Sequence, residues 1–242
     1  MNHNKAFIIV VVLLSASVSV YELYQRYNTE EEPRFQWPDK VDIPCNPDST
    51  EFDCEVYAQV SSTPVKSLQH PTNNEIWIAA LNGIITSWDG TTMTEIGNLS
   101  NVISNCHNEQ GLLGFEFTHD FSSSQEILLS YTENADCEGG SNLSGMVIAS
   151  VEVVDNKINM NSLVELRTIA KENRNHNGGN LHSLNDGTYL WSLGDGGGSS
   201  DPYGNGQNVH NPLGTIQYFS YGNKMIEPCL LYTSPSPRDM SA

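Results

Sequence analysis

The sequence is short of basic residues. Its 242 residues include 11 lysines and arginines against 29 aspartates and glutamates, which gives a formal net charge of −18 at pH 7. Nucleic-acid phosphates and anionic membrane surfaces are both bound through Lys and Arg side chains, so this shortage argues against both as partners. The abundant carboxylates are instead typical of a soluble exported protein whose oxygen atoms can bind hard cations.

Several catalytic motifs are also missing. There is no G-x-x-x-x-G-K-[ST] phosphate loop, no G-x-S-x-G nucleophile elbow and no H-E-x-x-H zinc helix. The glycine-rich loop at residues 194–199 lacks the third glycine of the fingerprint G-x-G-x-x-G, and no C-x-x-C pair occurs. These absences argue against phosphate-loop enzymes, α/β-hydrolases, zinc enzymes and nicotinamide-binding Rossmann domains.

The N-terminus has no apolar run long enough for an ordinary membrane span, which needs about 20 residues. Lys5 precedes an apolar run at residues 6–14 and a small-residue stretch at 15–19. This layout predicts a signal peptide at residues 1–20, with an uncleaved anchor formed by residues 6–20 as the alternative. The protein is therefore expected to be secreted, periplasmic or otherwise extracytoplasmic. Residues 21–55 are predicted to form an acidic linker with a small disulfide-closed segment.

The cysteine pattern fits export. Of the five cysteines, Cys229 lies in a C-terminal segment that is set aside below, and an even number remains. Four cysteines can be connected in three ways, and proximity in the sequence favours the one that joins Cys45 to Cys54 and Cys106 to Cys137. Two N-x-S sequons, at Asn98 and Asn142, would be used only in a host that glycosylates.

The C-terminal residues do not follow the pattern of the rest of the chain. Residues 229–239 resemble a translated sequencing adapter. Residues 229–242 are therefore predicted to be a non-native tail, and the natural chain is expected to continue past about Pro228. A genuine disordered Ser-Pro tail is the alternative.

The middle of the chain lacks helical periodicity and shows short apolar or alternating runs between turn residues, the pattern of an all-β protein. Asn82-Gly83 predicts a two-residue hairpin turn. Periodicity alone leaves a sandwich, a barrel or a propeller open. The predicted strands are residues 75–80, 84–88, 93–96, 112–118, 126–132, 145–153, 163–169, 181–184, 188–193 and 215–219.

The most informative stretch follows the predicted strand at 188–193. That strand runs directly into Gly194-Asp195-Gly196-Gly197-Gly198, a loop with almost no side chains to block a ligand, so a binding site is predicted there. Together with His176-Asn177-Gly178-Gly179-Asn180-Leu181, Asp201-Pro202, Asn205-Gly206-Gln207 and the earlier Glu109-Gln110-Gly111-Leu112-Leu113-Gly114-Phe115, this loop resembles the signature of the glucose/sorbosone dehydrogenase family.

The resemblance implies a six-bladed β-propeller of four-stranded blades, of which residues 56–228 would supply an N-terminal fragment with about half of the blades. It also implies an oxidoreductase that oxidises an aldose or related sugar by hydride transfer to pyrroloquinoline quinone (PQQ). Calcium would act as Lewis acid, a histidine would take the hydroxyl proton, and an external electron acceptor would be the second partner.

The resemblance assigns candidate residues to these roles. Family enzymes continue the first motif as F-x-F-H-P-D-F, whereas this chain has Thr118 at the base position and His119 one residue later, so His119 is the candidate base. Ser199-Ser200 replace the Arg-Asn that holds the cofactor in characterised members, and Arg174 could compensate. The other candidate cofactor-binding residues are His176, Asp195, Gly196, Gly197, Gly198 and Ser199, and the candidate calcium ligands are Asp195, Asp201, Asn205 and Gln207.

Two alternatives stay open at this point. Asp195 and Asp201 could cap turns, as Asp does beside Gly and Pro, instead of binding a metal. The whole chain could also be a non-catalytic extracellular propeller that binds a protein or glycan, like the related hedgehog-interacting proteins. In either case the 242-residue chain alone is expected to be inactive as an enzyme.

Overall fold

The computed structural model describes residues 57–134 and 145–232, with side chains described as far as residue 227. These residues belong to one compact unit that begins at Val56. The predicted signal peptide, the acidic linker, Cys45, Cys54, Cys137 and residues 233–242 lie outside the described residues. Among the residues that are described, no helix is long and apolar enough to span a membrane.

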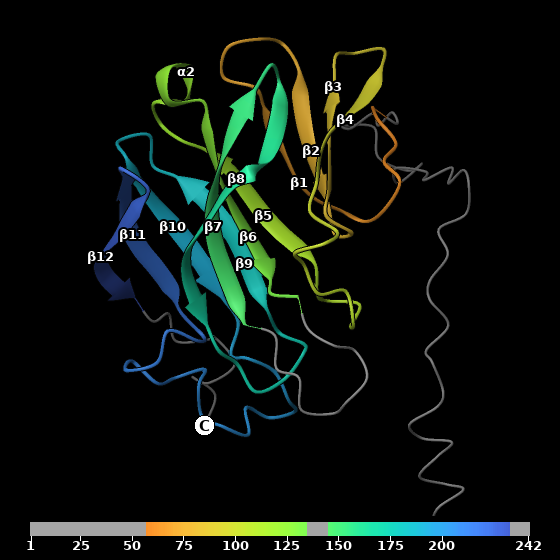
Figure 1. The fold of residues 1–242 in the computed structure, drawn as a ribbon. Coiled ribbons are helices and arrows are strands. Elements are labelled where there is room, and N and C mark those ends of the chain that lie inside the picture. The colour runs from red at the N-terminus through yellow and green to blue at the C-terminus, as the bar shows by residue number, and fades with distance from the viewer. Residues whose placement is uncertain (1–56, 135–144, 233–242) are drawn as a thin grey trace, which may run out of the picture. The chain divides into compact units, whose positions relative to one another are not determined.

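The described residues form three four-stranded antiparallel sheets and one short helix (Figure 1). The strand orders are β1-β2-β3-β4, β5-β6-β7-β8 and β12-β11-β10-β9. The first sheet contains β1 (Pro64–Gln69), β2 (Ile76–Ala80), β3 (Ile84–Trp88) and β4 (Met93–Asn98). The second contains β5 (Leu112–Phe117), β6 (Glu126–Thr132), β7 (Met146–Val154) and β8 (Lys157–Ile169), with α2 (Phe121–Ser124) between β5 and β6. The third contains β9 (Gly178–Ser183), β10 (Thr188–Leu193), β11 (Ile216–Gly222) and β12 (Met225–Tyr232).

Tight turns explain the up-and-down order of each sheet. A turn at Asn82-Gly83 is confirmed, but residues 81–83 connect β2 to β3, three residues instead of the predicted two, and only Gly83 has a positive φ, +88°. Asp155 and Asn156, at φ +51° and +60°, make a two-residue turn between β7 and β8. Two consecutive positive φ values match the twist of paired strands, which is why short polar residues fill such turns.

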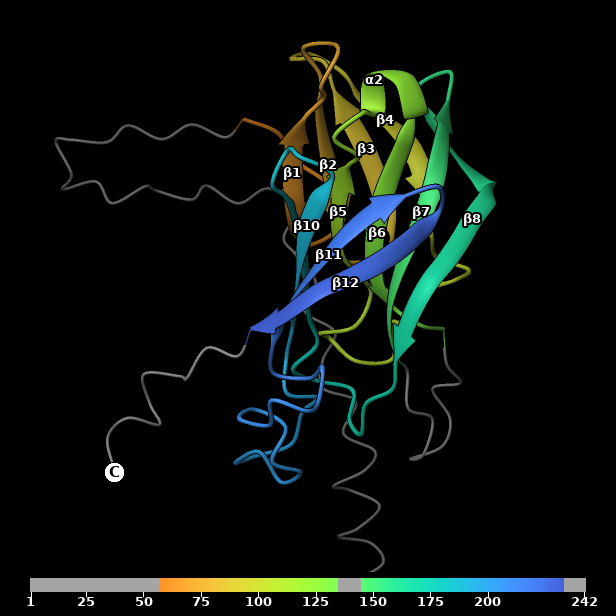
Figure 2. The same cartoon turned by 90° about the vertical axis from the view of Figure 1, so that its left-hand side faces the viewer.

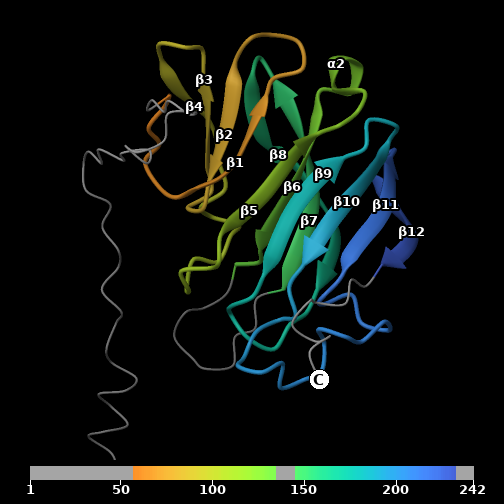
Figure 3. The same ribbon diagram turned by 180° about the vertical axis from the view of Figure 1, so that it is seen from behind.

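One strand of each sheet, β1, β5 and β9, lies beside its counterpart in the neighbouring sheet, as the view from behind shows (Figure 3). In the side view, β11 and β12 lie in front of strands of the second sheet (Figure 2). β5 and β9 approach so closely that a Cβ on Gly114 would lie 2.6 Å from the carbonyl oxygen of Gly179. Lys66 of β1 donates to Glu116 Oε2 of β5 at 3.1 Å and to the carbonyl of Leu181 on β9. The three innermost strands are therefore joined by both packing and charge.

Two hydrophobic clusters fill the space between the sheets. The first joins β1–β4 to one face of β5–β8 and contains Trp77 and Phe115, both with no exposed surface. The second joins the other face of β5–β8 to β9–β12, and there Trp191 Nε1 donates to Ser130 Oγ at 2.8 Å. Because each sheet buries a face against its neighbour, burial of these large side chains stabilises the stacking of blades, by about 1.5–3 kcal/mol for each side chain.

The all-β prediction is confirmed, and most predicted strands match to within two or three residues. Strands β1 and β12, the first half of β8 and helix α2 were not predicted. β8 alternates polar and apolar residues from Lys157 onward, and its burial alternates weakly because it is the outer strand of its sheet. The backbone of β12 continues through residues 229–232, inside the segment predicted to be non-native. Cys106 is disulfide-bonded; its expected partner is among the residues outside the description.

Candidate functional site

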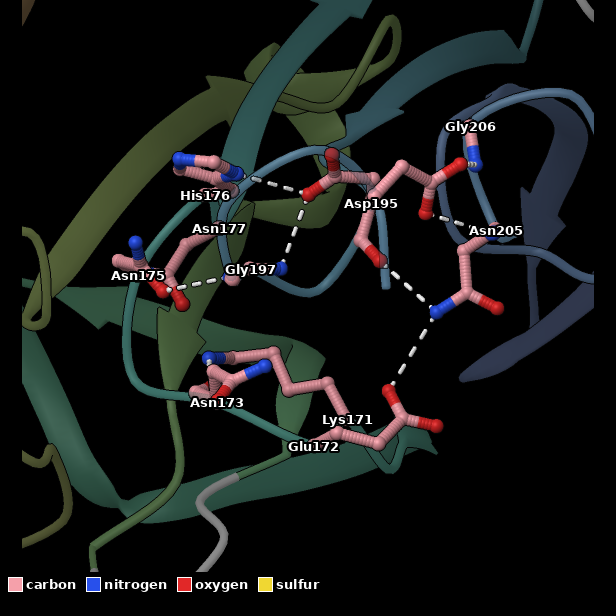
Figure 4. A network of polar contacts seen from close by, with 12 residues as sticks. Lys171, Glu172, Asn173, Asn175, His176, Asn177, Asp195, Gly197, Asn205 and Gly206 are labelled. Carbon is pink, nitrogen blue, oxygen red and sulfur yellow. Dashed lines mark hydrogen bonds and ion pairs between the residues drawn. The ribbon is translucent and has the colours of Figure 1, made fainter. Parts of the chain in front are cut away.

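Three loops meet at one end of the sheets. They are the β4–β5 loop (99–111), the β8–β9 loop (170–177) and the β10–β11 loop (194–215). Polar contacts of Glu109 join the first loop to the second. Figure 4 shows the network between the second and the third. The backbone N–H of Asn173 donates to the carbonyl of Gly196 at 3.1 Å, which ties the second loop to the third. The glycine-rich loop and the start of the H-N-G-G-N-L motif, which the β9–β10 hairpin separates in the sequence, therefore lie side by side.

His176 is the focus of this network. Its Nδ1 lies 2.9 Å from Asp195 Oδ1, and its backbone N–H donates to Glu109 Oε2 at 2.6 Å. The imidazole is 45% exposed, while Asp195 is 25% exposed. His176 also has φ +53°, a left-handed conformation that is uncommon outside glycine and costs of the order of 1–3 kcal/mol. Two carboxylates from two other loops thus hold one histidine in a strained and outward-facing position.

The glycines of the loop serve close packing. A Cβ on Gly194 would lie 1.9 Å from the carbonyl oxygen of His176, and one on Gly197 would lie 2.1 Å from Asn175 Oδ1. Gly197 also has φ +94°. The sequence predicted an open loop that admits a ligand. In the structure, Gly196 and Gly197 are buried, and the missing side chains let the β10–β11 loop lie directly against the β8–β9 loop.

Asp201 and Asn205 shape the loop that follows. Asp201 accepts the backbone N–H groups of Asn205 and Gly206, one on each carboxylate oxygen, at 2.8 and 2.9 Å. Asn205 is buried; its Nδ2 donates to the Asp195 carbonyl at 2.9 Å, and its Oδ1 accepts from Asn211 at 2.7 Å. These contacts are those of residues that cap turns. In the described ranges, no group of three or more His, Cys, Asp or Glu side chains could hold a metal ion.

Thr118 and His119 lie at the opposite end of the strands. The Thr118 hydroxyl is buried and contacts Ser124 Oγ at 2.8 Å and the Glu126 carbonyl at 2.9 Å. His119 donates its backbone N–H to Tyr189 Oη at the start of β10, whereas the glycine loop begins at Gly194 after the end of that strand. Five residues of extended chain separate those two points, about 16 Å at roughly 3.3 Å per residue. The structure does not bring His119 and the glycine loop together.

The same distant end holds a cavity of about 490 Å³, lined by Gln69, His70, Pro71, Thr72, Asn73 and Asn74 of the β1–β2 turn. It is lined by one turn and faces none of the predicted site residues. Geometry and polar contacts around His176, not cavity size, therefore locate the candidate site.

Lys171 is an unexpected member of the network. It is 1% exposed, and its Nζ donates to the Asn173 carbonyl beneath the glycine loop. Burial lowers the pKa of Lys171 to about 8, although the nearby carboxylates of Glu109 and Glu172 act in the opposite direction. Asn173 Nδ2 and Asn177 Oδ1 are buried in the same loop without a hydrogen-bond partner. A buried ammonium beside incompletely satisfied amides is characteristic of functional sites.

The remaining candidates lie around this cluster. Ser199 and Ser200 are exposed beyond the glycines, and Ser200 has φ +62°. Arg174 is half-buried on the β8–β9 loop, and its carbonyl accepts from Asn177 Nδ2 at 3.0 Å. Gln207 is exposed on the outer part of the β10–β11 loop.

Sequence reasoning did not assign Glu109, Lys171, Asn175 or Asn177. Glu109 and Asn177 stand inside the quoted motifs and Asn175 directly precedes His176, so these positions were a signal that could have been used. Lys171 carried no such signal, because a lysine two residues after a strand is most simply read as a surface residue.

Three stacked four-stranded sheets with adjacent inner strands and a polar site on the connecting loops define a β-propeller architecture. Within that class, the chain belongs to the glucose/sorbosone dehydrogenase family, whose model matches residues 62–223. No curated protein matches the chain.

Solved structures support the fold. The apo-form of the soluble aldose sugar dehydrogenase from Escherichia coli is 21% identical, with a TM-score of 0.54 over 66% of this chain and 44% of that one. The PQQ-bound form of the aldose sugar dehydrogenase from Streptomyces coelicolor is 19% identical, with a TM-score of 0.53 over 69% of this chain and 47% of that one. The chain thus spans less than half the length of these structures.

Proposed function

We propose that this protein is an oxidoreductase that oxidises an aldose or related sugar by transferring a hydride to PQQ. The observation that carries the proposal is the pairing of His176 with Asp195 at the meeting point of the three loops. Family membership supports the reaction class, and the Streptomyces relative is a PQQ-bound form. The electron acceptor that reoxidises the cofactor is proposed to be external.

His176 replaces His119 and Thr118 as the proposed general base. Asp195 accepts a hydrogen bond from Nδ1–H, which fixes the tautomer that leaves Nε2 unprotonated. Nε2 can then accept the proton of the substrate hydroxyl as the hydride leaves the adjacent carbon. Glu109 holds the main chain of His176, so the ring needs little reorganisation during proton transfer.

The residues around His176 fit part of the cofactor site. Ser199, Ser200 and the His176 ring are exposed together at the rim of the glycine loop, and Arg174 lies on the neighbouring loop. The buried but unpaired Asn173 Nδ2 and Asn177 Oδ1 leave polar capacity at the same place. PQQ, when bound there, would supply the quinone carbonyl that accepts the hydride.

The calcium ligands suggested by the resemblance fit less well. Both carboxylate oxygens of Asp201, Oδ1 of Asp195 and Oδ1 of Asn205 already accept hydrogen bonds within the loop. The proposed proton transfer therefore does not depend on a calcium ion held by Asp195, Asp201, Asn205 and Gln207.

Because the 242-residue chain alone is expected to be inactive, the test uses the full-length gene product. The assay is reduction of an artificial electron acceptor by this purified protein with PQQ and a panel of aldoses, with calcium present and with chelator. Asp195→Asn and His176→Asn should each lower the turnover by about 10²–10⁴-fold, the usual contribution of a general base. His182→Asn is the matched control, because His182 is exposed on β9 and belongs to none of the contacts described above. The absence of dye reduction with any sugar, together with no retained cofactor absorbance after desalting, would contradict the proposal.

A second candidate function is a non-catalytic extracellular propeller that binds a protein or glycan. The observation in its favour is that serines stand where a cofactor-binding cation is expected, and that the oxygens of the expected calcium ligands are already used. A protein that retains no PQQ but binds a glycan array reproducibly would support this alternative.

A further inference from the structure

One motif in the sequence plays no part in the proposed chemistry: the sequon Asn98-Leu99-Ser100. Asn98 is the last residue of β4, the outer strand of the first sheet. Asn98 and Ser100 are exposed, while Leu99 between them has no exposed surface and belongs to the first hydrophobic cluster. The buried leucine therefore fixes a surface turn whose two polar residues face outward.

The local hydrogen bonds leave the Asn98 amide nitrogen accessible. Asn98 Oδ1 accepts the backbone N–H of Ser100 at 3.0 Å, an Asx-turn that directs Nδ2 away from the chain. Nδ2 has one long contact, 3.5 Å to Oε1 of the exposed Glu95. A group attached to Nδ2 would thus displace one weak contact between two exposed side chains, and no part of the core.

The chemical surroundings fit an exported chain. Cys106, a few residues further along the same connection, is disulfide-bonded, and disulfides persist in the oxidising compartments through which glycoproteins pass. The N-terminal segment is independently predicted to be an export signal. The inference depends on export and not on the proposed enzymatic function.

We propose that Asn98 is an N-glycan acceptor when the chain is exported by a cell that glycosylates. The sugar donor is an oligosaccharide carried on a lipid pyrophosphate. Nδ2 forms a bond to the anomeric carbon, the anomeric C–O bond breaks, the lipid pyrophosphate leaves with the electron pair, and Nδ2 gives up one proton. No oxidant or reductant takes part.

A glycan at this position would also shield a sheet edge. β4 pairs with β3 on one side only within its sheet, and outer strands are sites of unwanted pairing between chains. A bulky hydrophilic group at the end of β4 hinders such pairing. Glycosylated protein is therefore expected to aggregate less on heating than the same protein after enzymatic deglycosylation.

The test is cell-free translation of the full chain with endoplasmic-reticulum microsomes, once with its own N-terminus and once with a known secretory leader fused ahead of it. Protease protection reports export, and endoglycosidase treatment reports the glycan. Because Asn142 is a second sequon, the informative background is Asn142→Gln. In that background the exported chain should show one endoglycosidase-sensitive shift, which Asn98→Gln and Ser100→Ala should each abolish and Ser100→Thr should retain.

Each outcome of the microsome experiment either supports or overturns the proposal. A shift that depends on Asn98 supports the proposal, whichever leader brings the chain into the microsomes. Protected chain with the fused leader but without an Asn98-dependent shift overturns it. Since translation products are assayed directly, a variant that folds poorly still gives a readable result.

Discussion

The charge pair between the inner strands offers the sharpest test of how the sheets are held together. Lys66 and Glu116 side chains are 12% and 9% exposed, and their Nζ and Oε2 atoms are 3.1 Å apart. The mutation Lys66→Met keeps the length of the side chain but leaves the Glu116 carboxylate without its cation. Removing one partner of a buried pair typically destabilises a protein by about 3–5 kcal/mol.

The structure indicates a value near the lower end of that range. Glu116 retains two other donors, the backbone N–H groups of Phe117 and Ser183, each at 3.2 Å. Against this, the Leu181 carbonyl loses the hydrogen bond from Lys66, a further loss of about 1 kcal/mol. The expected net loss in the free energy of unfolding is about 3–4 kcal/mol.

Urea unfolding followed by tryptophan fluorescence measures this loss. With a slope of about 2 kcal/mol per molar urea, the midpoint should fall by roughly 1.5–2 M. The double variant Lys66→Met/Glu116→Gln removes both charges and should recover about half of the loss or more, because no carboxylate is then left unpaired. A Lys66→Met protein within about 1 kcal/mol of wild type, or a double variant no better than the single one, would refute the reasoning.

Two further predictions concern the site loops. Gly197→Ala places a Cβ 2.1 Å from Asn175 Oδ1 and should lower the free energy of unfolding by several kcal/mol. Gly204→Ala, at φ +67° with no atom within 4 Å, should lower it by only about 1 kcal/mol. Thermal melting of both variants checks whether close packing or backbone conformation causes the larger loss. Lys171→Met should be more stable than wild type at pH 7, by up to about 3 kcal/mol, because burial holds the pKa of Lys171 at about 8 instead of 10.5. Between pH 8 and pH 10.5 the unfolded chain keeps a proton on Lys171 that the folded chain has lost, so wild-type stability rises with pH. The stability difference between Lys171→Met and wild type should therefore shrink by about pH 10. Urea unfolding at four pH values measures this difference, and a constant difference would contradict the prediction.

The pattern of the sequence was sufficient for much of the fold. Runs bounded by Asn-Gly or Asp-Gly identify β3 and β10 to the residue, because strand periodicity and tight turns are local properties. The apolar run at residues 126–132 identifies β6. β1 escaped prediction, since Pro64–Gln69 shows no strong alternation and becomes a strand through its pairing with β2. β12 was also missed. It follows a turn at Asn223-Lys224, where both residues have positive φ, and Asn-Lys is a weaker turn signal in a sequence than Asn-Gly.

The all-β class, the family and the importance of the stretch from Arg174 to Asn205 could be derived from the sequence alone, because motif residues and strand periodicity are local features of the chain. The choice of His176 over His119 as the proposed base depended on the folded structure, because only there does His176 meet Glu109 and Asp195. His119 and His176 lie in equally suggestive motifs, but His119 follows the end of β5 and His176 precedes the start of β9, at opposite ends of the sheets. The same is true of Lys171, whose burial arises because loops from two neighbouring sheets close over it, a contact between distant segments that no local pattern records.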